Sequence, residues 1–79
     1  MMNDLLQNIA LLHTTELGAE RIRRNLELST EDIVSWCAEQ ILQKDAKLER
    51  IGKNWYITVE RCRITVNAHS YTIITAHKL

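Results

Sequence analysis

The chain has 79 residues, of which 46% are hydrophobic, and its ten basic and ten acidic side chains give a formal net charge of zero. A chain of this length forms one domain around a modest core, so we expect a single domain over residues 1–79, with a helical part at 1–43 and a β part at 48–78. No apolar run approaches the roughly 18 residues that a membrane span needs, and the first residues lack the pattern of a signal peptide. We therefore expect a cytoplasmic protein.

The charge is divided unevenly between the two parts. Residues 1–43 carry three basic and seven acidic side chains, a net charge of −4, whereas residues 44–79 carry seven basic and three acidic side chains, a net charge of +4. The β part could therefore attract an anion. Alternatively, the two parts complement each other within one fold.

Two helices are predicted first. Leu5, Leu6, Ile9 and Leu12 recur at helical spacing, with Met2 before them, and predict a helix over 2–12. The pair at 14–15 consists of two threonines, either of which can cap a second helix over about 15–25.

A third helix is predicted to begin at Ser29, because Ser29 and Asp32 have the spacing of a capping box. It should end near Gln43, and a polar loop follows over 44–47.

The periodicity then changes from helical to alternating. The pattern predicts a short edge strand at 48–51, a turn at Gly52–Lys53, a strand at 54–59, a reversal at Arg61, a strand at 63–68, a reversal at 69–70 and a strand at 71–77. The fold class is α+β, with three N-terminal helices followed by a three- to four-stranded antiparallel β-meander. A winged helix-turn-helix fits the same order, but the segment 30–43 contains no Arg or Lys, which disfavours DNA binding by that helix.

Motifs for bound groups are missing from the sequence. Cys37 and Cys62 do not form a Cys-x-x-Cys pair, and no histidine or acidic cluster has metal-ligand spacing. We expect no metal and no cofactor, and two reduced, buried thiols.

The β part holds the candidate site. If the last two strands align, Asn67, Tyr71, Thr75 and His77 form a polar patch on one side of the sheet, although Ile73 lies among them. A solvated sheet face built from good strand formers is the alternative.

The histidines suggest acid–base chemistry. His13, His69 and His77 can exchange protons near neutral pH, and Arg21, Arg24, Lys53 or Arg63 can hold a phosphate group. Metal-independent RNA cleavage requires these two kinds of group. A structural or solvated role is the alternative for each histidine. The run Lys53-Asn54-Trp55-Tyr56 places a cation, an amide and two aromatic rings side by side at a turn, which suits stacking on a base. A core Trp with an exposed Tyr neighbour is the alternative.

Two stretches resemble a small bacterial domain family of unknown function. The first is His13-Thr14-Thr15-Glu16-Leu17-Gly18 with Arg21-Ile22 and Asn25-Leu26, and the second is Lys53-Asn54-Trp55-Tyr56 with the run from Ile64 to Lys78. The resemblance covers nearly the whole chain and implies no activity.

A more distant resemblance is to RelE/barnase-like ribonuclease toxins. Arg21-Ile22, Glu31-Asp32-Ile33 and the strand from Ile73 to His77 occupy the places of short motifs in some of those groups. The chain departs from them in having Leu17 where a histidine is common, His77 where the final aromatic stands, and no net positive charge.

These observations lead to two functional hypotheses. The first is a metal-independent ribonuclease of the toxin type, which would imply RNA and an antitoxin protein as partners. Its expected catalytic residues are His13, Arg21, Asn67, Tyr71, Thr75 and His77, and its expected substrate-binding residues are Lys53, Tyr56, Arg63 and His69. The second is a non-catalytic protein-interaction module, an inhibitor or a homo-oligomeric adaptor, with an edge strand available for pairing.

Overall fold

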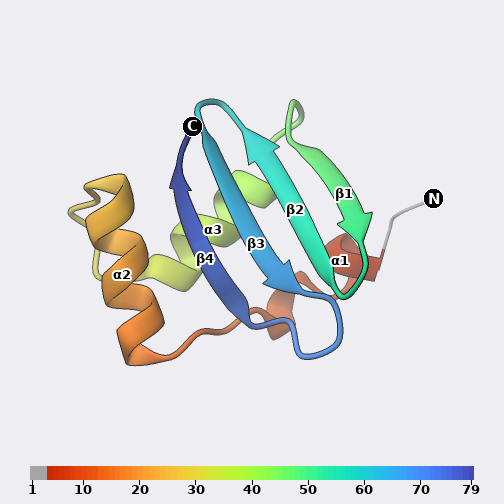
Figure 1. Ribbon diagram of the computed structural model, residues 1–79, viewed down its shortest axis with the longest axis horizontal. Coiled ribbons are helices and arrows are strands. Elements are labelled where there is room, and N and C mark those ends of the chain that lie inside the picture. The colour runs from red at the N-terminus through yellow and green to blue at the C-terminus, as the bar shows by residue number, and fades with distance from the viewer. Residues whose placement is uncertain (1–3) are drawn as a thin grey trace.

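A computed structural model describes residues 4–79 and shows an α+β fold with three α-helices and one four-stranded antiparallel sheet (Figure 1). The elements are α1 (Asp4–Gln7), the 3-10 helix η1 (Ile9–Leu11), α2 (Glu16–Leu26), α3 (Ile33–Ile41), β1 (Lys47–Ile51), β2 (Asn54–Val59), β3 (Cys62–Asn67) and β4 (Ile73–Lys78). The strands lie in the order β1-β2-β3-β4, so each pairs with its neighbour in sequence. The predicted α+β class with an antiparallel sheet is confirmed, and the sheet has four strands.

The core lies on one face of the sheet. In Figure 1, α3 and α1 lie behind the strands and α2 runs beside β4, so the face toward the viewer has no helix over it. The buried hydrophobic side chains come from the covered face, from the helices and from the C-cap of η1: Leu5, Leu12, Ile22, Leu26, Ile33, Cys37, Ile41, Trp55, Ile57, Val59, Cys62, Ile64, Val66, Ile73 and Ala76. No helix within residues 4–79 is long and apolar enough to cross a membrane.

The first predicted helix is divided in two. Residues 2 and 3 lie outside the described residues, and the segment from Asp4 to Leu11 forms α1 and η1 on either side of Asn8. The Asn8 side chain donates from Nδ2 to the carbonyl oxygen of Asp4 at 2.9 Å. Asparagine competes in this way with the helical hydrogen-bond pattern, so the expectation of a continuous helix over 2–12 was wrong.

Helix α2 has well-defined ends. Thr15 is its N-cap, and the Thr15 Oγ1 accepts a hydrogen bond from the Gly18 N–H at 2.9 Å. At the other end, Leu28 N–H donates to the Arg23 carbonyl at 2.9 Å while Glu27 adopts a left-handed conformation with φ 53°, which is the Schellman arrangement. The Lys78 ammonium hydrogen-bonds the Glu27 carboxylate and holds its pKa below the ordinary value.

Helix α3 begins later than predicted, at Ile33. Asp32 is itself the N-cap, and its carboxylate accepts from the Ser35 N–H at 3.0 Å and from Ser35 Oγ at 2.8 Å. These hydrogen bonds lower the pKa of Asp32. The capping box predicted at Ser29 was therefore wrong. Asp32 was expected inside the first turn of a helix capped by Ser29, but Asp32 is itself the cap.

The last strand also begins later than predicted. Tyr71 lies in the β3–β4 loop with φ 60°, and β4 starts at Ile73. The register between β3 and β4 shifts at Thr65/Val66, so that Val66 pairs with Ile73 and Thr65 with Thr75. Ile74 is the extra residue of this bulge, and an extra residue reverses the alternation of faces. Tyr71, Ile73 and Thr75 were expected on one side, but Ile73 is buried against the core.

The outer edge of β4 is covered by the segment that leads into α2 and by α2 itself. The Ile73 N–H donates to the His13 carbonyl at 2.8 Å, and Thr14 Oγ1 donates to the Ile73 carbonyl at 3.0 Å. Farther along, Asn25 Nδ2 donates to the Ala76 carbonyl at 3.2 Å. These contacts attach the helical part to the meander.

Candidate nucleic-acid interface

The open face of the sheet carries polar side chains in rows that run across the strands. The register places Thr58 between Lys47 and Arg63, and Arg63 beside His77. We call Lys47, Thr58, Arg63 and His77 the cationic row. Since neighbouring strands lie about 4.8 Å apart, the row crosses the whole sheet in roughly 14 Å.

A second row lies next to the first. It consists of Glu49, Tyr56, Thr65 and Thr75, which pair in that order across the four strands. Thr65 is only 7% exposed although it belongs to the open face, which shows that the side chains around it pack closely. Tyr56 is half-buried, and its hydroxyl lies 3.4 Å from Asn54 Nδ2. The two rows together present an aromatic ring beside basic groups.

Arg63 has a hydrogen-bonding atom without a partner. Its Nε is buried, and no hydrogen-bond acceptor among residues 4–79 contacts it. Buried donors are nearly always paired in folded proteins, so this unpaired Nε is unusual. The Arg63 residue as a whole is only half-buried, which leaves part of it accessible. Arg63 lies between Thr58 and His77 on the open face, where an incoming anion can reach the row.

His13 does not lie on this face. Its backbone bridges to Thr72, its Nε2 lies 3.0 Å from Thr72 Oγ1, and its Nδ1 lies 3.0 Å from the Leu11 carbonyl. Both ring nitrogens are therefore engaged in joining the N-terminal segment to the β3–β4 loop. The structure does not bring His13 together with His77, which is near the other end of β4.

Three other predicted site residues, Asn67, His69 and Tyr71, lie in or beside the β3–β4 loop. The Asn67 Oδ1 accepts from the N–H groups of His69 and Ser70, each at 2.9 Å. His69 is exposed, and Tyr71 packs its half-buried ring against the core. The expected patch of Asn67, Tyr71, Thr75 and His77 therefore divides into a loop-forming pair and a pair on the open face.

Arg21 and Lys53 lie at the borders of the sheet. Arg21 is exposed on α2, one turn before Asn25, whose side chain contacts the β4 edge. Arg21 lines a surface hollow of α2 together with the exposed residues Leu17, Glu20 and Arg24. Lys53 is exposed in the β1–β2 turn, and its carbonyl accepts from the Ala68 N–H at 2.8 Å.

Sequence reasoning missed Lys47 and Thr58 as members of the site. Lys47 was placed in the loop at 44–47, although it is the first residue of β1 and pairs with Thr58. Alternation counted back from Glu49 would have placed Lys47 on the same face as Glu49.

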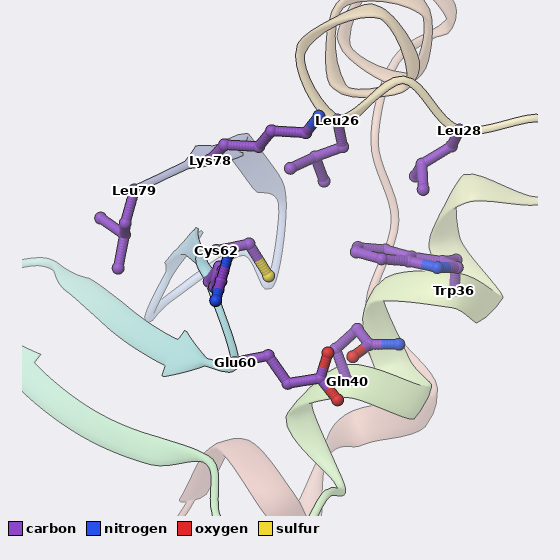
Figure 2. A pocket seen from close by; sticks show the side chains of 9 residues that line it. Leu26, Leu28, Trp36, Gln40, Glu60, Cys62, Lys78 and Leu79 are labelled. Carbon is purple, nitrogen blue, oxygen red and sulfur yellow. The ribbon is translucent and has the colours of Figure 1, made fainter.

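A separate hollow of about 420 Å³ lies between the end of α2, α3, the β2–β3 turn and the last residues (Figure 2). It is lined by Leu26, Leu28, Trp36, Gln40, Glu60, Arg61, Cys62, Lys78 and Leu79. Figure 2 shows Lys78 and Leu26 on one side of the hollow and Glu60 and Gln40 on the other. None of the predicted site residues lines it.

The thiol in this hollow is not an activated nucleophile. Cys62 Sγ donates to the Val59 carbonyl at 3.2 Å, and burial, followed by the nearby Glu60 carboxylate, raises the pKa of the thiol. Nucleophilic cysteines have a lowered pKa instead. Cys37 and Cys62 are both free and buried, as predicted.

We expect the burial of the Cys37 thiol to make the domain less stable at alkaline pH. Burial, with a smaller contribution from Cys62, raises the pKa of Cys37 to about 12, whereas a thiol in the unfolded chain titrates near 8.5. The folded chain therefore holds this proton more tightly, and the stabilisation is fully present below about pH 8.5 and is lost as pH rises toward 12. We expect the free energy of unfolding in urea to fall with pH in this window more steeply in the wild type than in Cys37→Ala, by up to about 1.4 kcal/mol per pH unit, because the variant retains only the smaller effect of Cys62. Equal slopes in the two proteins would contradict this assignment.

Within residues 4–79, no group of three or more His, Cys, Asp or Glu side chains is placed to hold a metal ion.

A family model described as a protein of unknown function, DUF3781, matches residues 6–77. No curated protein and no solved structure gives a significant match. The chain therefore belongs to the DUF3781 family, whose function is unknown.

Proposed function

We propose that this domain binds single-stranded RNA on the open face of its sheet. The observation that carries the proposal is the cationic row, with Arg63 at its centre and Tyr56 in the adjacent row. Proteins that bind single strands combine basic groups for the backbone with aromatic rings on which bases stack. Because no helix covers this face of the sheet, an extended RNA strand can reach both the basic groups and the aromatic ring.

Cleavage of the bound RNA is the finer part of this proposal. It is supported by the position of His77 beside Arg63, which places an imidazole, a side chain suited to proton transfer, next to a fixed cation. In such a reaction His77 would transfer a proton at the ribose or at the leaving oxygen, while Arg63 and Lys47 would stabilise the charged phosphate. Of the two histidines predicted to be catalytic, His77 alone is left for this proton transfer, because both ring nitrogens of His13 are engaged in hydrogen bonds.

Binding is tested with a fluorescently labelled single-stranded RNA and three variants. We expect Arg63→Gln and Tyr56→Leu each to weaken binding about tenfold, and Arg63→Gln to reduce the dependence on salt by roughly one ion. Arg61→Gln is the matched control, since Arg61 lies in the β2–β3 turn beside the hollow and not on the open face. Equal affinities for Arg63→Gln and the control would refute the proposal.

The same RNA, incubated with a chelator and analysed by gel electrophoresis, tests cleavage. If the domain is a ribonuclease, the wild-type protein cuts the RNA and His77→Ala binds it without cutting. If the wild-type protein binds the RNA and leaves it intact, the domain is a binding module and the cleavage part fails.

A further inference from the structure

The two edges of the sheet differ in how their backbone groups are used. At the β4 edge, groups of His13, Thr14 and Asn25 hydrogen-bond the outer backbone of Ile73 and Ala76. Strand β1 is the other edge; among residues 4–79 no strand pairs with its outer side, and in Figure 1 α1 lies behind the end of β1. An uncovered edge strand offers a row of backbone donors and acceptors to another strand.

The turn between β1 and β2 determines which groups of β1 face outward. Gly52 and Lys53 form a two-residue turn that closes on the pair Ile51 and Asn54. In an antiparallel ladder, hydrogen-bonded and non-hydrogen-bonded pairs alternate from such a closing pair. The backbone N–H and C=O groups of Leu48 and Arg50 therefore point away from β2.

The charges of β1 select one register for a second copy. With a twofold axis at Leu48, antiparallel pairing places Lys47 opposite the partner's Glu49, and Glu49 opposite the partner's Lys47. These are non-hydrogen-bonded pairs, in which side chains approach most closely. An axis at Glu49 would place two carboxylates opposite each other, and an axis at Arg50 would place two guanidinium groups opposite each other.

The side chains that would form these pairs are available in the single chain. Lys47 and Glu49 are both exposed, and the ion pairs among residues 4–79 are Arg24–Glu20 and Lys78–Glu27. Leu48, half-buried on the opposite face of β1, would meet the partner's Leu48. A charged edge usually discourages strand pairing, but here a second copy supplies the matching charges.

We propose that two copies of this chain pair through the outer edge of β1, antiparallel about a twofold axis at Leu48, and join their four-stranded sheets into one continuous sheet. The axis is perpendicular to the sheet, so the open faces of the two copies lie on the same side. The proposal does not require RNA binding, and either can fail without the other.

Charge reversal tests this interface on the full chain. Sedimentation equilibrium over a micromolar to millimolar range should show a reversible dimer for the wild type. Lys47→Glu and Glu49→Lys should each weaken the dimer roughly tenfold or more, because two attractive pairs become repulsive. The double variant with both changes restores opposite charges across the axis and should dimerise like the wild type. Lys44→Glu, in the exposed loop before β1, is the control and should have no effect.

Amide hydrogen exchange provides a second measurement that needs no variant. The amides of Leu48 and Arg50 should become protected as the protein concentration rises, because their N–H groups would bond the partner. A wild-type chain that is monomeric at every concentration would overturn the proposal. So would a dimer that tolerates both single charge reversals, or one in which these two amides exchange equally fast at all concentrations.

Discussion

Replacing Ile64 by alanine is expected to lower the free energy of unfolding by about 2–5 kcal/mol. Ile64 is 0% exposed at the centre of the covered sheet face, between Ile57 on β2 and Ala76 on β4. Its neighbours belong to a hydrogen-bonded sheet and cannot move in to fill the space. Because small domains are stable by only about 5–15 kcal/mol, this single change would remove a large part of the total.

Ile64→Val is the matched control for this substitution. It removes one methylene group and keeps the branched shape that suits a strand, so we expect a loss of about 0.5–1.5 kcal/mol. Urea unfolding followed by circular dichroism measures both variants. A loss below about 1 kcal/mol for Ile64→Ala would show that the core relaxes around the cavity and is less rigidly packed than its burial indicates.

Gly18→Ala is expected to destabilise the domain by about 1–3 kcal/mol, although the same change in an ordinary helix stabilises by about 1 kcal/mol. A Cβ atom at Gly18 would lie 2.4 Å from Thr14 Oγ1 and 3.1 Å from Thr15 Oγ1. Neither hydroxyl can turn away freely, since Thr14 Oγ1 bonds the Ile73 carbonyl and Thr15 Oγ1 caps α2 at the Gly18 N–H. The new methyl group would therefore break a contact that attaches α2 to β4.

A double-mutant cycle separates this clash from other effects of the substitution. In a Thr14→Ala background the closest atom is gone, so Gly18→Ala should cost much less than in the wild type or should stabilise. We expect a coupling of at least about 1 kcal/mol between the two positions, within the range for residues in contact. A thermal midpoint that rises in Gly18→Ala alone would contradict the geometry at this helix start.

Local patterns predicted the elements that local interactions determine. Strand β2 has the predicted bounds, since its alternation between Trp55, Ile57 and Val59 on one side and polar residues on the other leaves one orientation. A threonine cap was also predicted before α2, at either Thr14 or Thr15, and the structure shows that Thr15 is the cap. The break at Asn8 and the helix cap at Asp32 were not predicted, because the sequence did not show which backbone group each side chain would bond.

The site was harder to predict, because it depends on pairings between strands. Arg63, Thr75 and His77 share the open face only because the bulge at Ile74 reverses the alternation of β4 after Ile73. Nothing in the run from Ile73 to His77 marks that extra residue. The role of His13 depends on a partner, Thr72, that lies 59 residues away, which is beyond the reach of any local pattern.

The occupied edge of β4 has a consequence for how far strand pairing can extend. A sheet with two free edges is divalent, so copies can add at both ends and grow into a filament. Here α2 lies beside β4 (Figure 1), and contacts from His13, Thr14 and Asn25 occupy outer backbone groups of Ile73 and Ala76, which leaves β1 as the edge that is open to a second copy. A domain with one open edge cannot form a filament by strand pairing, so the pairing proposed at β1 would stop at two copies. Detaching the segment before α2 from β4 would open the second edge of the sheet, and the domain would then form filaments instead of dimers.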